Sequence, residues 1–181
     1  GYEWTPDNLS GVAYMMWDAA NLYVAVRVRD DIHRSLTAAT PSGEQAIRGD
    51  SLVLGVQPVR GGSPSKAFAY YLTSAAPGGG SGAHTLFRPT DRAGGRESGH
   101  LFRDSSIYEM AVRTEEGVCV YELRIPLSEV GLSPNLGTRF GLSALLTDND
   151  GTRDPVARMT WGGGIEPAWT PEQFGVVTFV E

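Results

Sequence analysis

The first clear pattern along the chain is a pair of apolar stretches that flank a short polar turn, in the segment VAYMMWDAANLYVAVRVRDD. In the second stretch four apolar residues alternate with residues of mixed polarity: Leu22, Val24, Val26 and Val28 against Tyr23, Ala25, Arg27 and Arg29. Alternation with a period of two is typical of a strand with one buried face. The polar turn at residues 18–21 predicts a β-hairpin with the first set of side chains in the core.

The rest of the chain continues this pattern in short apolar runs separated by turns. These runs are SLVLGVQP, KAFAYYLTSA, the hairpin IYEMAVRTEEGVCVYELRIP, TRFGLSALLTD, VARMTW and FGVVTFV. The 23 glycines and 11 prolines interrupt long helices, and LSEVGLSP has room for one helical turn. The Gly-rich residues 76–100 lack apolar periodicity and are expected to form a mobile excursion at the sheet edge. We therefore predict an all-β fold, an antiparallel jelly-roll-like β-sandwich of about ten strands with minimal helix.

The length and charge of the chain limit the number of domains and the classes of partner that we expect. A chain of 181 residues, 41% of them hydrophobic, is expected to form a single domain, 1–181. Because it begins without an initiator methionine or an apolar export segment, we expect a piece of a larger protein. The net charge of -6 argues against a nucleic-acid partner, and no run of about 18 apolar residues indicates a membrane span. The single Cys119 lies in an apolar run and is expected to be a buried, inert thiol.

The sequence contains none of the common motifs for hydrolases, nucleotide binding or redox chemistry. Glu109 and Glu122 lie on the two arms of one predicted hairpin, and two carboxylates across a cleft are what glycoside hydrolysis requires. The same glutamates lie near Arg113 and Arg124, and cross-strand ion pairs of this kind are common on sheet surfaces. We favour the ion-pair interpretation and predict that the chain is not an enzyme.

The segment TDNDGTRD is the best candidate for a metal site. Asp148, Asp150 and Asp154 place carboxylates at alternating positions around a turn opened by Gly151, and oxygen ligands of this kind suit Ca²⁺. The same residues also form a strong turn sequence without any metal. Further carboxylates from residues 29–31 (RDD) and from Asp50 are candidates to join the site in space.

Several segments occur in an order that resembles a known family. They are WDAANLYVAVRVRDD, GDSLVLGV, YELRIPLSEVG, RFGLSALLTDNDG and WGGGIEPAWTPEQFG. This ordered set is similar to the family 9 carbohydrate-binding modules and their DOMON-like relatives, which are accessory domains of secreted bacterial enzymes. The resemblance implies a non-catalytic sugar-binding domain, an extracellular or periplasmic location, and structural calcium ions. Its partners would be an oligo- or polysaccharide and the other domains of its parent protein.

In the family two tryptophans clamp a terminal sugar ring, and the resemblance places Trp169 at one of these positions. The other clamp position is Ile47, and the family's polar sugar contacts fall on apolar residues here: Val53, Ala69 and Leu145. The family's site is therefore largely not reproduced. We expect Trp169 either to contact sugar with new partners, such as Tyr70, Tyr71 or Arg48, or to be a packing residue, and we expect Trp161 to be a packing residue.

Two alternatives remain open at this stage. The first is a structural or partner-docking sandwich whose sugar site has decayed, as the loss of the second tryptophan suggests. The second is a haem-binding DOMON-like domain, for which the methionines and histidines supply the ligand types. The candidate haem ligands are Met15, Met16, Met110, Met159, His33, His84 and His100.

Overall fold

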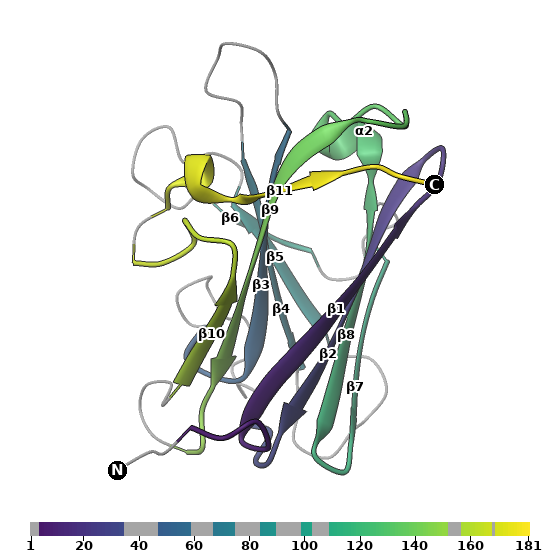
Figure 1. Cartoon of the computed structure of the whole chain (residues 1–181). Helices are drawn as coiled ribbons and strands as arrows, with labels where there is room; N and C mark the ends of the chain where they lie inside the picture. The colour runs from purple at the N-terminus through teal and green to yellow at the C-terminus, as the bar shows by residue number, and fades with distance from the viewer. Residues whose placement is uncertain are drawn as a thin grey trace.

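The computed structural model describes residues 4–34, 47–58, 67–74, 84–89, 99–102, 109–151, 157–167 and 169–181. Side chains are described in these ranges except at residues 74, 84–89 and 99–102. The described chain forms two antiparallel sheets with a short helix at one end (Figure 1). The predicted all-β sandwich is therefore confirmed.

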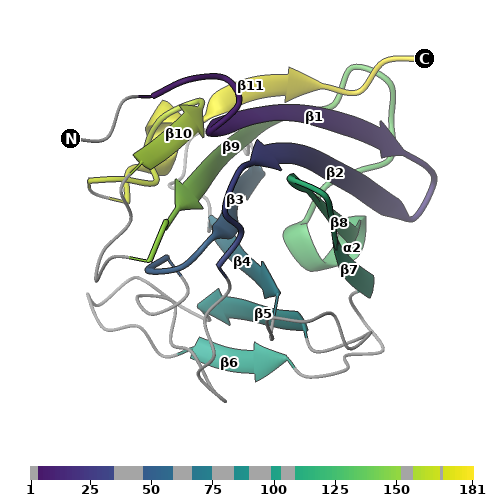
Figure 2. The same cartoon turned by 90° about the horizontal axis from the view of Figure 1, so that it is seen from below.

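The four-stranded sheet has the order β1-β2-β8-β7. Its strands are β1 (Leu9–Trp17), β2 (Asn21–Asp30), β7 (Glu109–Glu115) and β8 (Val118–Pro126). The seven-stranded sheet has the order β10-β9-β3-β4-β5-β6, and β11 pairs with β9. Its strands are β3 (Ser51–Pro58), β4 (Phe68–Ser74), β5 (His84–Pro89), β6 (Gly99–Phe102), β9 (Arg139–Asp148), β10 (Ala157–Trp161) and β11 (Gly175–Thr178). Figure 2 shows how the strands of this larger sheet curve round from β11 to β6.

The main core lies between the two sheets. All four apolar residues of the predicted inward face of β2 are buried there: Leu22, Val24, Val26 and Val28. From the other sheet Leu52, Leu54 and Tyr70 point into the same core, and Cys119 is buried as predicted. Trp17 stacks on Phe179 with ring centroids 4.5 Å apart and joins the core only partly. The predicted hairpin register is confirmed.

The helical content is small, as expected. The helix α2 (Leu127–Val130) is one turn long, and Gly131 ends it in the left-handed conformation with a φ of 67°. The 3₁₀ helix η1 (Pro171–Gln173) is the other helical element in the described chain. No helix among these residues is long and apolar enough to span a membrane.

The Gly-rich stretch differs from the expectation of an irregular excursion. β5 and β6 both lie within or at the end of it and extend the larger sheet beyond β4. Backbone pairing forms these strands although the sequence carries almost no alternation of apolar and polar residues. Strands without this alternation cannot be recognised from the hydrophobic pattern of the sequence.

β1 occupies an edge of the smaller sheet. Its register with β2 is continuous from Leu9 to Trp17, and its other side pairs with no strand in the described part of the chain. Val12, Tyr14 and Met16 alternate along its outer side and are exposed. β7, at the opposite edge, instead exposes Glu109 and other charged side chains.

Candidate functional site

A second, smaller hydrophobic cluster lies on the outer face of the seven-stranded sheet. Its floor is Val53 of β3, Tyr71 of β4 and Leu145 of β9, which lie side by side because Val53 pairs with both of the others. Ala69 completes the floor. Neighbours of Val53 in β3 face the main core, so the whole floor points away from it. β3 is therefore buried on both faces, and we call this surface the covered face.

The chain itself covers this face with a loop whose described residues are 162–167 and 169–174. Two backbone hydrogen bonds close the loop, from Gly163 N to Gln173 O (3.2 Å) and from Thr170 N to Gly164 O (2.8 Å). Phe174 at its end lies directly over Gly55, where an added Cβ would overlap the ring. Gly55 thus leaves the space that lets the loop approach the sheet.

Trp169 is held by this loop on the covered face. It is partly buried, packs against the cluster together with Ile47 and Ile165, and meets Phe174 edge to face with ring centroids 5.3 Å apart. An edge-to-face contact fixes one aromatic ring against another and leaves part of the indole open to solvent.

The other three predicted sugar contacts, Tyr71, Arg48 and Tyr70, lie in different surroundings in the structure. Tyr71 belongs to the covered face and is nearly buried, while Arg48 is exposed beside Ile47. Tyr70 is fully buried in the main core, because neighbouring residues of a strand point to opposite faces. Tyr70 therefore drops out of the candidate site. Trp169, Tyr71 and Arg48 remain predictions.

Trp161, expected to pack, ends β10 and is half-exposed, at 50%. Its carbonyl accepts a hydrogen bond from Ser143 Oγ at 2.9 Å, and its ring lies against Gly175. It is not part of the covered-face cluster. Trp161 and Trp169 thus belong to different surroundings.

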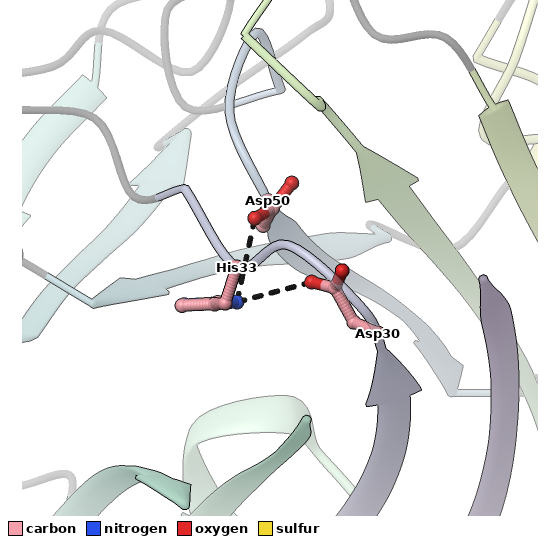
Figure 3. Close-up of side chains that lie close together, drawn as sticks. All are labelled: Asp30, His33 and Asp50. Atoms are coloured by element: carbon pink, nitrogen blue, oxygen red, sulfur yellow. Dashed lines mark hydrogen bonds and ion pairs between the residues drawn. The ribbon is translucent and has the colours of Figure 1, made fainter. Parts of the chain in front are cut away.

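A cluster of acidic side chains lies at the ends of β2, β3 and β9. His33 Nδ1 is 3.3 Å from Asp30 Oδ2 and 3.4 Å from Asp50 Oδ2, so one imidazole lies between two buried carboxylates (Figure 3). Asp30, Asp148 and Asp150 form a second group whose oxygens lie within 4.8 Å of one another. Asp30 belongs to both groups, so the structure brings Asp148 and Asp150 close to Asp30, and Asp50 and His33 close to the same Asp30. Asp154 lies outside the described residues. We call Asp30, Asp50, Asp148 and Asp150 the acidic cluster.

Burial changes the proton affinity of this cluster. The pKa of Asp50 is raised to about 7, chiefly because burial penalises the charged carboxylate and then because of the negative charge of Asp30. Hydrogen bonds from the backbone amides of Arg34 and Asn149 oppose this rise. The pKa of Asp150 is also raised, by burial and by the charges of Asp31 and Asp30.

These residues fit a hard cation. The four aspartates supply only oxygen ligands, and Asp30, Asp50 and Asp148 are buried at places where uncompensated charge is costly. Oδ1 of Asp150 is buried and has no hydrogen-bond partner within the described residues. Groups of acidic residues that can hold a metal ion are therefore present.

The acidic cluster is joined to the covered face through the backbone. Asn149 donates from its side-chain amide to the carbonyl of Arg48, and its backbone N–H donates to Asp50 Oδ1 at 2.6 Å. Thr147 Oγ1 donates to the carbonyl of Gly49 at 2.7 Å. These bonds tie the segment that carries Ile47 and Arg48 to the end of β9.

Glu109 and Glu122 do not form an isolated carboxylate pair. Glu109 lies opposite Arg124, with 3.1 Å between carboxylate and guanidinium, and Glu122 is 4.0 Å from Arg113. This is the cross-strand ion-pair arrangement predicted from the sequence.

Sequence reasoning missed two participants. His33, named from the sequence only among the candidate haem ligands, follows Asp30 closely enough to face it across a turn. Asn149 appears in the sequence only as part of a turn, whereas its side-chain amide donates to the carbonyl of Arg48 and its backbone N–H donates to Asp50. The only signal for Asn149 is its position between two candidate ligands in TDNDG.

No family model matches the sequence, and no curated protein matches it. Solved structures do share its fold. A family 9 carbohydrate-binding module from Caldicellulosiruptor kristjanssonii in complex with glucose is 18% identical, with a TM-score of 0.61 over 96% of this chain and 81% of that chain. A family 9 module from the same organism in complex with cellotriose is 18% identical, with a TM-score of 0.60 over 94% and 74%.

A Bacteroides uniformis protein provisionally assigned to carbohydrate binding is 12% identical, with a TM-score of 0.62 over 95% of this chain and 79% of that one. At these identities the likeness establishes the fold. The fold expected from the resemblance to family 9 modules is thus confirmed, whereas nothing in these three structures supports the DOMON-like part of the resemblance or a haem site.

Proposed function

We propose that this chain is a non-catalytic carbohydrate-binding module that attaches a larger secreted protein to a polysaccharide. The observation that carries the proposal is Trp169, an indole fixed by Phe174 and partly open on the outer face of a rigid sheet. Similar modules of the same fold have been solved with glucose and with cellotriose. Attachment raises the local concentration of the parent protein at its substrate.

The chemistry of the covered face suits one side of a sugar ring. The C–H face of a pyranose packs on an aromatic ring, and the hydroxyls at its rim need hydrogen-bond partners. Trp169 supplies the ring, and the exposed guanidinium of Arg48, next to Ile47, supplies donors. Tyr71 is nearly buried and supports the floor. With Ile47 at the second clamp position, the sugar is stacked on one side only.

We propose calcium as the ion held by the acidic cluster, through Asp30, Asp50, Asp148 and Asp150. When bound, calcium would supply positive charge that balances the buried carboxylates. Because Asn149 and Asp50 hold the Arg48 segment, the ion would also order the backbone beside the sugar site. Its role is structural, and the sugar does not need to touch it.

The test is a glycan array and an insoluble-polysaccharide pull-down in calcium buffer, with Trp169→Ala compared against Trp161→Ala. Both variants remove a partly exposed indole, but only Trp169 lies on the covered face. Trp169→Ala should weaken binding about thirtyfold or more, the loss of a hot-spot aromatic worth about 2 kcal/mol. Trp161→Ala should bind like the wild type.

The controls separate the alternatives. Equal circular dichroism spectra and melting temperatures would show that the variants are folded. If the folded wild type binds no glycan, the sugar proposal fails and a structural or partner-docking role takes its place. If both variants bind as the wild type does, sugar binding stands but Trp169 does not carry it.

A further inference from the structure

A groove crosses the outer side of the four-stranded sheet, on the opposite side of the molecule's main core from the covered face. The strand registers define it as two parallel rows of outward side chains. One row is Tyr14, Ala25, Glu122 and Ala111; the other is Met16, Tyr23, Arg124 and Glu109. Between the rows, Val24 and Leu123 are buried in the main core and Met110 packs against it, so backbone forms most of the floor. The groove has a volume of about 730 Å³.

Two small residues create this hollow. Ala25 of β2 and Ala111 of β7 occupy positions in one row where larger side chains would fill the space. Glu122 stands between them on β8. The groove extends over four strands, a width of about 14 Å at the usual strand spacing, which suits an elongated ligand that lies across the strands.

Tyrosines supply the apolar contacts at one end of the groove. Tyr14 is 59% exposed on the edge strand β1. Tyr23, on β2, is held in place because its hydroxyl donates to Asp18 Oδ2 at 2.8 Å and accepts from Asn21 Nδ2 at 3.3 Å. A ring fixed in this way loses little conformational freedom when a ligand packs on it.

Charged groups supply the polar contacts, and their charges balance. Arg124 is anchored by Asn21 Oδ1 at 3.1 Å and by Glu109 at 3.1 Å, and Glu122 pairs with Arg113 at 4.0 Å. The lining carries Glu109, Glu122 and Arg124, and Arg113 beside the groove pairs with Glu122. Each carboxylate therefore has a guanidinium partner, and the four groups together carry no net charge that would attract an ionic ligand. They do offer donors and acceptors side by side, which is what vicinal hydroxyls require.

We propose that this groove is a second binding site, for a neutral oligosaccharide chain. Tyrosine faces pack on the apolar side of pyranose rings, and the carboxylates and guanidiniums bond the hydroxyls. An apolar side-chain surface of a partner protein fits less well, because apolar side chains would cover these charges without offering them hydrogen bonds. The site is separate from Trp169, and its contribution to polysaccharide attachment rests on the proposed function. Two sites on opposite faces would make the module bivalent.

The test is a titration of the whole ¹⁵N-labelled chain with cellohexaose, xylohexaose and mannohexaose, followed by amide chemical shifts. It uses the wild type, Trp169→Ala, Tyr14→Ala and Val12→Ala. Val12 lies on the same outer side of β1 but does not line the groove, so Val12→Ala is the matched control. A capped peptide of alternating leucine and lysine serves as the competing probe.

We expect at least one oligosaccharide to shift the amides of Ala25, Ala111 and Glu122 in the wild type and equally in Trp169→Ala. Tyr14→Ala should weaken this binding about tenfold, and Val12→Ala should not change it. Absence of groove shifts with all three sugars, or shifts with the peptide alone, would overturn the proposal. Groove shifts without any response near Trp169 would support the groove and contradict the covered-face site, so the two proposals fail separately.

Discussion

The two sheets expose their outer faces to very different surroundings. On the seven-stranded sheet the outer residues Val53 and Leu145 are fully buried beneath the loop that carries Ile165 and Trp169. On the four-stranded sheet the outer residues Val12 and Met16 stay exposed on β1. Yet β3, which contains SLVLGV, and β1, which contains VAYMM, both carry apolar residues on both faces.

This difference shows that apolar residues on both faces of a strand do not by themselves predict that both faces are buried. Whether the outer face is buried depends on another part of the chain covering it. Burial of β3 depends on a loop more than a hundred residues away in the sequence, which returns over the sheet because Gly55 admits Phe174. β1 has no such cover within the described residues. The covered face therefore carries a site shaped by a loop. The outer face of the four-stranded sheet carries a groove shaped by the small side chains of Ala25 and Ala111.

The largest expected effect is a dependence of stability on pH that comes from the acidic cluster and not from the four-stranded sheet, which we call the open sheet. The pKa of Asp50 is about 7 in the fold, above the ordinary value of 3.8. The folded state therefore binds this proton more tightly than the unfolded state does. Without calcium, stability should fall by several kcal/mol as the pH rises from about 4 to about 7, and then level off.

Calcium should replace the proton in this role. Melting temperatures with calcium and with chelator, at pH 5 and pH 8, should show the larger calcium effect at pH 8. Glu122→Gln on the open sheet should leave the profile unchanged. A chelated protein that becomes more stable as the pH rises through this range would contradict the raised pKa, and no calcium effect at pH 8 would contradict the metal proposal.

A matched pair of substitutions tests the two faces directly. Val53→Ala deletes buried methyl groups and leaves a cavity, so the free energy of unfolding should fall by about 2–3 kcal/mol. Val12→Ala makes the same chemical change at a residue that is 52% exposed and should cost less than about 0.5 kcal/mol. Urea denaturation of both variants provides the measurement. Equal losses would mean that the two faces do not differ in burial.

The next effect concerns the loop that covers the sheet. Gly55→Ala places a methyl group where the Phe174 ring lies, and overpacking of this kind should cost about 1–3 kcal/mol. Gly163→Ala is the control, because its Cβ would meet its neighbours at 3.4 Å, an ordinary contact. Thermal unfolding and tryptophan fluorescence should report the displaced loop. Wild-type stability in Gly55→Ala would show that the loop is free to shift.

The smallest effect belongs to the surface of the open sheet. A double-mutant cycle on Glu109 and Arg124, each changed to alanine, should give a coupling free energy of at most about 1 kcal/mol, because Glu109 is well exposed. The coupling should weaken further at high salt. A coupling of several kcal/mol would indicate a buried network and would contradict the open character of this face.

Local pattern was enough for much of the fold. The alternation in β2 gave its inward face correctly, and the apolar run around Cys119 gave its burial. In both cases one side of the strand is clearly more polar than the other, so the period of two carries the information. The strands β5 and β6 were missed because their residues show no such contrast.

The candidate site was only partly predictable. Tyr70 and Tyr71 are adjacent, and in a strand buried on both faces alternation does not say which tyrosine points outward. The acidic cluster brings Asp50, just before β3, and Asp148, at the end of β9, close to Asp30 at the end of β2, and that meeting depends on the fold rather than on sequence spacing. The turn TDNDG indicated two of the ligands, and the tertiary fold brought the others to them.

The edge position of β1 has a practical consequence for handling the protein. Its sequence LSGVAYMMW contains no charge and no proline, and its continuous register keeps the edge regular. Natural sheets commonly interrupt such edges with lysine, proline or a bulge, because unpaired backbone groups otherwise recruit strands from other molecules. Concentrated solutions of this chain are therefore prone to intermolecular β-pairing along β1. One lysine placed at Val12 would be the simplest solubility mutation, since it adds charge at a position that packs against nothing in the core.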